Sequence, residues 1–217
     1  KEVEVIKLIL GVGTGIWTAP KAGRYEIYGI AAGGGVWTRG YYADGIEILW
    51  PVNAKYYGGG GGGAFKEIVS LNKDEQVQYT VGSRGEGSSS LRASIVPPPA
   101  GDGGNTTFGS LIAYGGQGGN GDVPAQGGVG SASNGGNGGF DNTTATSGGL
   151  WAGDGGPTAI IGDGVANQTT FSPRGEGSLG YFVNGAYGRG DNRVYNLNNH
   201  GVMQIIYLGP ENSNNQD

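Results

Sequence analysis

The chain has 217 residues, enough for one or two domains, and 50 of them are glycine, which is several-fold above ordinary usage. A formal net charge of −5 argues against a nucleic-acid-binding surface, and the lack of cysteine excludes disulfides, thiolate metal sites and cysteine nucleophiles. A charged fraction of 14% with 12 Tyr and 4 Trp argues against a disordered linker, because large rings need burial or a ligand.

Two further properties limit the function. The single histidine excludes a zinc site built from several histidines, and no apolar run reaches the length of a transmembrane helix, so we expect no membrane insertion. Residue 1 is Lys rather than Met, so we expect the chain to be processed, trimmed or part of a larger product.

Alternating apolar residues predict six β-strands outside the glycine-rich stretches. In chain order the predicted strands are 2–10, 24–32, 64–71, 76–81, 105–114 and 201–208. Both faces of 24–32 carry apolar residues, so this strand is expected to be covered on both sides, and Gly109 is expected to bend 105–114 into two short strands. Residues 17–23 are expected to be a strand end and a turn, and 82–104 a loop. No segment has a convincing helical period.

Between these strands lies a segment of different character, residues 36–57. It contains six large rings: Trp37, Tyr41, Tyr42, Trp50, Tyr56 and Tyr57. Six consecutive glycines, 58–63, follow it. Flat rings suit recognition of sugars or of a protein receptor, and they suit equally a packed hairpin or a seam between subunits.

Residues 115–140 keep a three-residue glycine register that only Pro124 and Ser133 interrupt. The register contains Gly115, Gly118, Gly121, Gly127, Gly130, Gly136 and Gly139. This period matches the polyproline II helix, which has three residues per turn and no internal hydrogen bonds. Such helices must pair with each other or with a sheet, and the spacing resumes at Gly153, so an array is expected over about 115–164. Collagen needs a longer strict repeat and more than the 9 prolines present.

Several motifs occur in a suggestive order: WTAPKAGRYEIYGIAAGGG at 17–35, a glycine run before AFKEIVSL at 64–71, VQYTVG at 77–82, GGNTTFGSLIAYGGQGGNG at 103–121, and the closing GVMQIIYLG at 201–209. In this order they resemble the glycine-rich domain of bacteriophage tail-fibre and adhesin proteins, over most of the chain. The long insertion at 36–57 and the less regular final third depart from the pattern of many relatives.

The resemblance implies an all-β fold, a β-sandwich or jelly-roll-like frame with glycine-rich polyproline II helices packed against it and essentially no α-helix. We expect a single domain over 1–209, with an aromatic insertion at 36–57 and a polar tail at 210–217. The resemblance also implies a trimeric or tip-located virion protein that binds the host surface. The expected partners are a host cell-surface glycan or outer-membrane protein, other virion proteins and further copies of this chain, as a homotrimer.

The candidate receptor-binding residues are Trp37, Tyr41, Tyr42, Trp50, Tyr56, Tyr57, Trp151 and Tyr187. Trp151 lies between glycines, and Tyr187 lies in an Asn-rich stretch whose Asn and Tyr suit adaptable polar recognition. For each ring, packing or subunit contact remains the alternative interpretation.

No catalytic residue and no metal or cofactor site is predicted. Residues 118–122 nearly match a calcium-binding repeat, but Asp122 comes one position early and the repeat does not recur, so turn formation explains it and calcium remains an alternative. The glycines after residue 10 have the wrong spacing for a dinucleotide fingerprint. No two of the acidic candidates for sugar cleavage are linked by the sequence: Glu26, Glu47, Glu67 and Glu176.

Four functional classes are compatible with these sequence features or were weighed against them. The first is the virion adhesin. The second is a purely structural head-fibre, capsid-decoration or filament subunit whose aromatic residues make subunit contacts. The third, an ice-binding or receptor-type glycine-rich domain, usually has disulfides in its receptor form, and the fourth, a depolymerising tail enzyme, lacks an acidic pair.

Overall fold

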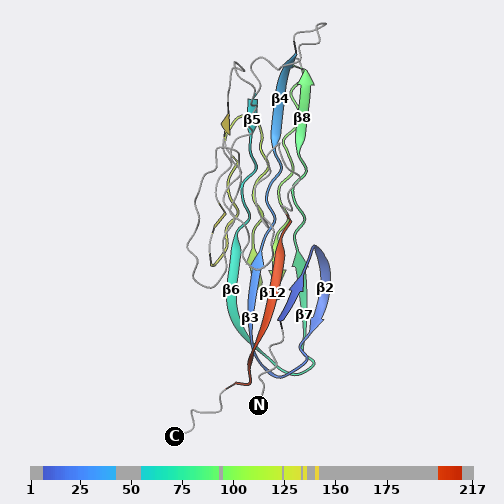
Figure 1. The fold of residues 1–217 in the computed structure, drawn as a ribbon, viewed down its shortest axis with the longest axis vertical. Coiled ribbons are helices and arrows are strands. Elements are labelled where there is room, and N and C mark those ends of the chain that lie inside the picture. Colours follow the sequence, from blue (N-terminus) through green and yellow to red (C-terminus); the bar gives the residue numbers. More distant parts are fainter. Residues whose placement is uncertain are drawn as a thin grey trace.

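The computed structural model describes residues 7–42, 55–92, 95–123, 125–132, 134–135, 140–141 and 200–211. These residues contain no helix and form twelve strands in three four-stranded sheets. The molecule is elongated, with two sheets at one end and the third at the other (Figure 1). The all-β prediction is therefore confirmed for the described part of the chain.

The first two sheets hold the strands nearest the start and end of the described chain. The first has the order β1 (Lys7–Leu10), β12 (Val202–Gly209), β3 (Gly23–Ile30), β6 (Ala64–Leu71). The second has the order β10 (Leu111–Ala113), β9 (Thr106–Phe108), β7 (Gln76–Val81), β2 (Gly13–Thr18). All neighbours in both sheets are antiparallel. We call this end of the molecule proximal.

The third sheet marks the opposite end, which we call distal. Its order is β11 (Phe140–Asp141), β5 (Lys55–Tyr57), β4 (Trp37–Tyr42), β8 (Ser88–Arg92). Strands β4 and β5 form an antiparallel pair, whereas β4 and β8 run parallel. The aromatic insertion thus contributes two neighbouring strands to the distal sheet.

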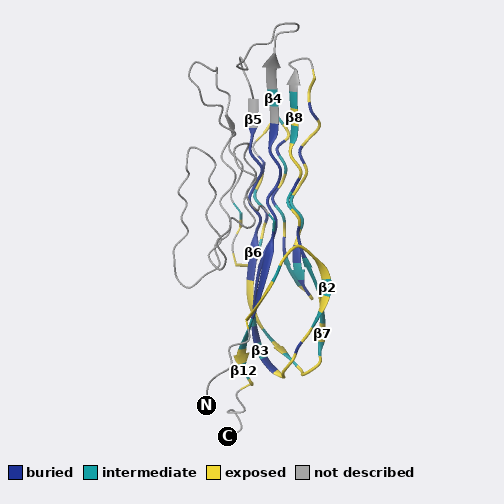
Figure 2. Cartoon of the chain, turned by 45° about the vertical axis from the view of Figure 1, so that its right-hand side comes forward, coloured by how far each residue is buried: buried dark blue, intermediate teal, exposed yellow. Residues whose placement is uncertain are grey.

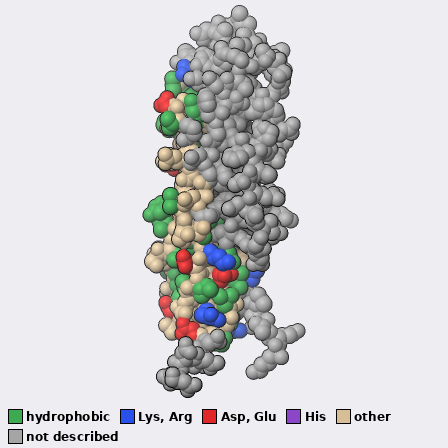
Figure 3. Space-filling view, turned by 90° about the vertical axis from the view of Figure 1, so that its left-hand side faces the viewer, with side chains coloured by type: hydrophobic (Ala, Val, Ile, Leu, Met, Phe, Trp, Pro, Cys, Tyr) green, Lys and Arg blue, Asp and Glu red, His purple; other side chains and the backbone are tan. Residues whose placement is uncertain are grey.

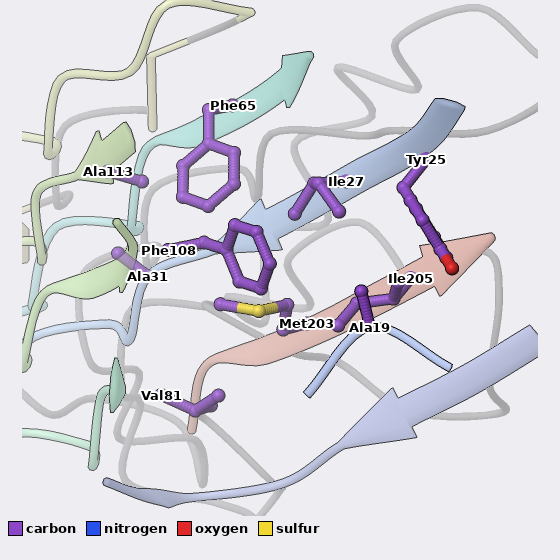
Figure 4. Packing of buried hydrophobic residues seen from close by; sticks show 10 residues of the cluster. All are labelled: Ala19, Tyr25, Ile27, Ala31, Phe65, Val81, Phe108, Ala113, Met203 and Ile205. Carbon is purple, nitrogen blue, oxygen red and sulfur yellow. The ribbon is translucent and has the colours of Figure 1, made fainter. Parts of the chain in front are cut away.

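The hydrophobic core lies between the two proximal sheets (Figure 4). Tyr25 and Ile27 on β3 are completely buried, and Trp17 of the opposite sheet packs edge-on against Tyr25 with ring centroids 5.2 Å apart. The hydroxyl of Tyr25 donates to the carbonyl of Lys21 at 2.6 Å, which satisfies its polar end. On the other face of β3, Tyr28 and Ile30 are buried as well. Strand β3 is therefore covered on both sides, as its sequence predicts.

Glycine-rich segments connect the proximal sheets to the distal sheet and run along the long axis (Figure 2). Their hydrogen bonds recur every three residues. Residues 31 and 34 donate to the carbonyls of 63 and 60, residues 32 and 35 donate to those of 104 and 101, and residues 116 and 119 donate to those of 32 and 35. Segment 31–36 is therefore the centre of this bundle, because it bonds to segments 58–63, 82–87, 100–104 and 114–121.

Burial in these segments follows the same three-residue period. Among the described residues of 113–130, the buried positions are Ala113, Gly116, Gly119, Ala125 and Gly128. Side chains at Gln117, Asn120 and Val129 are exposed. A Cβ atom at Gly115, Gly118 or Gly130 would collide with backbone of a neighbouring segment, so the predicted register does face neighbours. The most buried glycines, however, are Gly116, Gly119 and Gly128, each of which follows a glycine of the predicted register by one residue. Both sets are close to neighbours, because each segment has neighbouring segments on two sides.

Several strand boundaries match the sequence pattern closely. Strands β6 and β7 have the predicted limits, and Gly109, with φ of +56°, turns the chain between β9 and β10. Five strands lie outside the predicted strand ranges: β2, β4, β5, β8 and β11. Strand β2 starts among glycines at Gly13, and β8 lies in the expected loop 82–104, where its serine-rich sequence gives no alternating apolar pattern. The predicted single domain and the boundaries of its tail stay predictions.

Candidate recognition surface at the distal end

Trp37 opens strand β4 and organises the base of the distal sheet. Its side chain is 2% exposed, and its ring packs edge-on against Tyr57 with centroids 5.7 Å apart and an interplanar angle of 72°. The indole N–H donates to the carbonyl of Pro97 at 3.1 Å, and Ala100 completes the buried cluster. Trp37 therefore joins three stretches of chain that are distant in sequence.

A fourth stretch approaches the indole through a glycine. Gly121 has a φ of +83°, and a Cβ atom there would lie 2.6 Å from the Trp37 ring. Only glycine combines this backbone conformation with so close an approach. Burial raises the pKa of Tyr57, and the negative charge of Asp122 adds to the rise, so Tyr57 stays a neutral phenol.

The positions of Trp37 and Tyr57 correct their predicted role. Both were expected to bind a receptor, but Tyr57 is 6% exposed and Trp37 less, so neither ring offers a face to a ligand in this chain. Their physical role is packing, because two large rings fill the space where the glycine-rich segments pass into the distal sheet. The packing alternative weighed for the aromatic insertion therefore holds for these two residues.

The other aromatic candidates divide into two groups. Tyr41 and Tyr42 lie near the end of β4, and Tyr56 lies in β5 opposite Thr38, so these three belong to strands of the distal sheet. The remaining candidates lie outside the described residues: Trp50, Trp151 and Tyr187. Tyr41, Tyr42 and Tyr56 therefore lie on two neighbouring strands of one sheet.

The structure adds exposed residues that the sequence did not single out. Ile95, Val96 and Val123 are each at least half exposed, and Pro98 and Pro99 are exposed beside the buried Pro97. Ile95 and Val96 precede the Pro97 that Trp37 holds, and Val123 follows the Gly121 that lies against the same indole. The run of three prolines was the available signal, because it predicts a stiff segment that holds its side chains in fixed positions.

Polar side chains on the surface of the bundle have a structural role. Asp102 Oδ1 accepts from the backbone N–H of Gly118 at 2.8 Å, and Asn105 Oδ1 accepts from that of Gly115 at 3.0 Å. These N–H groups belong to the half-exposed glycine register. Short amide and carboxylate side chains therefore complete the bonding of the outer segments.

The described residues that the sequence offered as calcium ligands or as acids for sugar cleavage are hydrogen-bonded or ion-paired within the fold. Asn120 Oδ1 accepts from the N–H groups of Asp122 and Val123, which is a turn-forming arrangement. Glu26 pairs with Lys66 at 3.7 Å, and Glu67 accepts from the hydroxyl of Ser131 at 3.3 Å. Within the described ranges no three His, Asp or Glu residues are grouped as metal ligands would be. Glu47 and Glu176 lie outside those ranges, as do Gly136 and Gly139 of the predicted register.

The described part of one face carries acidic and basic side chains in alternation rather than in one large patch (Figure 3). This distribution agrees with the modest net charge of −5. In the ranges that the structure describes, no helix is long and apolar enough to span a bilayer.

No protein-family model matches the chain, and no curated protein sequence matches it significantly. The likeness to phage tail-fibre domains therefore rests on the motifs of the sequence alone.

Proposed function

We propose that this chain is a non-enzymatic structural protein of a virus particle, a phage tail-fibre or fibre-tip adhesin that binds a receptor on the host cell surface. One observation carries the proposal. Strand β1 begins and β12 ends at the proximal end, while the aromatic strands β4 and β5 lie at the distal end (Figure 1). An elongated scaffold attached at its proximal end would hold those strands toward the cell.

The proposed scaffold is a jelly-roll-like frame continued by polyproline II helices. The three-residue recurrence of hydrogen bonds and of burial supports polyproline II geometry for the segments 31–36, 58–63, 82–87, 100–104, 114–121 and 125–130. Glycine loses much backbone entropy on ordering, so the array is stable only as a bundle fixed to the proximal core. Such a bundle is a support, and recognition belongs to the residues at its distal end.

The proposed receptor is a cell-surface glycan or an outer-membrane protein, and other virion proteins and copies of this chain, as a homotrimer, are the remaining partners. The recognition residues at this end are Tyr41, Tyr42 and Tyr56 with the exposed aliphatic side chains beside Pro97, and Trp50, which lies outside the described residues, is a further candidate. Trp151 and Tyr187 stay further candidates. The protein needs no cofactor in this role, and its location is the surface of the extracellular particle.

A purely structural subunit of a head fibre, capsid or filament is the second candidate, and one observation favours it. Strand β2 is an edge strand of six residues without a charge, and Ile16 in its middle is 65% exposed. Uncharged, exposed edge strands invite pairing with another chain. In this alternative the distal rings contact neighbouring subunits instead of a receptor.

Binding to intact cells distinguishes the two candidates. Fluorescently labelled protein is incubated with a panel of bacterial strains, and binding is measured by flow cytometry for the parent, Trp50→Ala and Tyr114→Ala. Tyr114 is the matched control, because its ring is exposed on the bundle away from the distal sheet. The adhesin proposal expects loss of binding for Trp50→Ala alone. A parent protein that binds no strain but assembles into oligomers would favour the structural subunit.

A further inference from the structure

The only histidine of the chain lies where the proximal core meets the glycine-rich bundle. His200 precedes β12 by two residues and is half-buried. Its Nδ1 atom accepts a hydrogen bond from the backbone N–H of Arg84 at 3.0 Å. An acceptor at Nδ1 requires the neutral imidazole with its proton on Nε2, because a protonated Nδ1 is a donor.

The surroundings of this hydrogen bond are tightly packed. The N–H of Gly201 donates to the carbonyl of Gly82 at 2.9 Å, and a Cβ atom at Gly201 would lie 2.7 Å from Thr106 Oγ1. The buried hydroxyl of Thr106 accepts from the N–H of Gly82 at 3.1 Å and donates to the carbonyl of Ile30 at 2.9 Å. The backbone at Gly82 and at Gly201, next to the contact, is therefore held by hydrogen bonds.

Among the described residues, two charged groups act on the imidazole, both from segment 82–87. Burial is the main reason that the pKa of His200 lies below its ordinary value, and the positive charge of Arg84 lowers it further. The negative charge of Glu86 acts in the opposite direction. The balance keeps the ring neutral in the folded protein to a lower pH than in the unfolded chain.

We propose that the contact between His200 and Arg84 is an acid-sensitive clasp, which holds the start of β12 against residues 82–84 and opens when the imidazole is protonated. The proposal is independent of receptor binding. As the pH falls, the unfolded chain binds a proton near its ordinary pKa of about 6.5 before the folded protein does. The stabilisation is therefore complete above that value and is lost as the pH falls from there through the lower pKa of the folded protein.

Titration followed by NMR tests the clasp directly. The ring signals of His200 and the amide signal of Arg84 are recorded from pH 8 to 4.5 in the parent protein. We expect both to change with one midpoint below about 6.5, and we expect Nδ1 to be the unprotonated nitrogen at high pH. A midpoint at or above the ordinary value, or an Arg84 amide that does not follow the ring, would overturn the proposal.

Substitutions separate the clasp from general acid effects. His200→Asn keeps an acceptor at the position of Nδ1 but does not titrate, so its melting temperature should fall less between pH 7.5 and 5 than that of the parent, by about 2–4 °C, a shift of the size expected for one interaction in a protein of this length. An equal fall in both proteins would contradict the clasp.

Two further substitutions test the charged groups beside the ring. Arg84→Gln should raise the titration midpoint of His200, and Glu86→Gln should lower it. Unchanged midpoints would contradict control of the ring by segment 82–87.

Discussion

The indole N–H of Trp37 donates to the carbonyl of Pro97 at 3.1 Å, across sixty residues of sequence. This bond fixes the start of β4, directly after the central glycine segment 31–36, to the stretch that leads into segment 100–104. The Tyr57 ring and Gly121 close the other sides of the same indole. The base of the distal sheet therefore depends on one side chain.

Replacement of Trp37 tests this dependence. Trp37→Ala should destabilise the protein by about 3–5 kcal/mol, because a large buried ring is replaced by a cavity. Trp37→Phe keeps most of the ring but leaves the carbonyl of Pro97 without its donor, so a smaller loss of about 1–3 kcal/mol is expected. Denaturant unfolding measures both values. A loss below about 1 kcal/mol for Trp37→Ala would mean that the indole is not the anchor.

The glycine bundle predicts a strong dependence on position for Gly→Ala substitutions. Gly116→Ala should abolish cooperative folding, because its Cβ atom would overlap the carbonyl of Gly60. Gly11→Ala is the matched control, since nothing lies within 4 Å of its Cβ position and its φ is not positive. Circular dichroism during thermal unfolding measures both variants. Equal melting temperatures for the two variants would contradict the close approach of the segments.

The buried hydroxyl of Thr106 should contribute through its two hydrogen bonds rather than through its size. Thr106→Val keeps the shape but leaves the carbonyl of Ile30 and the N–H of Gly82 without their partner. We expect a loss of about 1–3 kcal/mol in the free energy of unfolding. Thr107→Val on the same strand, at a half-exposed position, should change stability by less than about 0.5 kcal/mol. A neutral Thr106→Val variant would show that water satisfies both groups.

The sequence predicts the proximal core well, because local alternation and burial coincide there. Strand 24–32 is apolar on both faces and is buried on both, and Gly109 bends the chain where the pattern breaks. Strand β8 could not be predicted, since its serines form a strand only by pairing with β4, which lies far away in sequence. The three-residue period was visible in the sequence, but the sequence did not show which glycines would be most buried.

The candidate site was predicted only in outline for a related reason. Composition identifies residues 36–57 as rich in rings, but it does not distinguish a ring that packs from a ring that faces a partner. Trp37 and Tyr57 are buried because residues 97–100 and 119–121 pack against them, a tertiary arrangement with no local signal. Exposed Val96 and Val123 were missed because aliphatic residues in loops follow no periodic pattern, and the three prolines after Val96 indicate only a stiff segment.

Site-specific photo-crosslinking during attachment to cells tests the central claim most directly. A photoreactive amino acid is placed at residue 42, at the end of β4, or at residue 73, in the exposed proximal turn after β6. The labelled proteins are bound to a strain that the parent protein recognises, and crosslinks to cell-surface molecules are counted. The account predicts crosslinks from residue 42 and none above background from residue 73. Equal crosslinking from both positions, or crosslinking from residue 73 alone, would contradict recognition at the distal end.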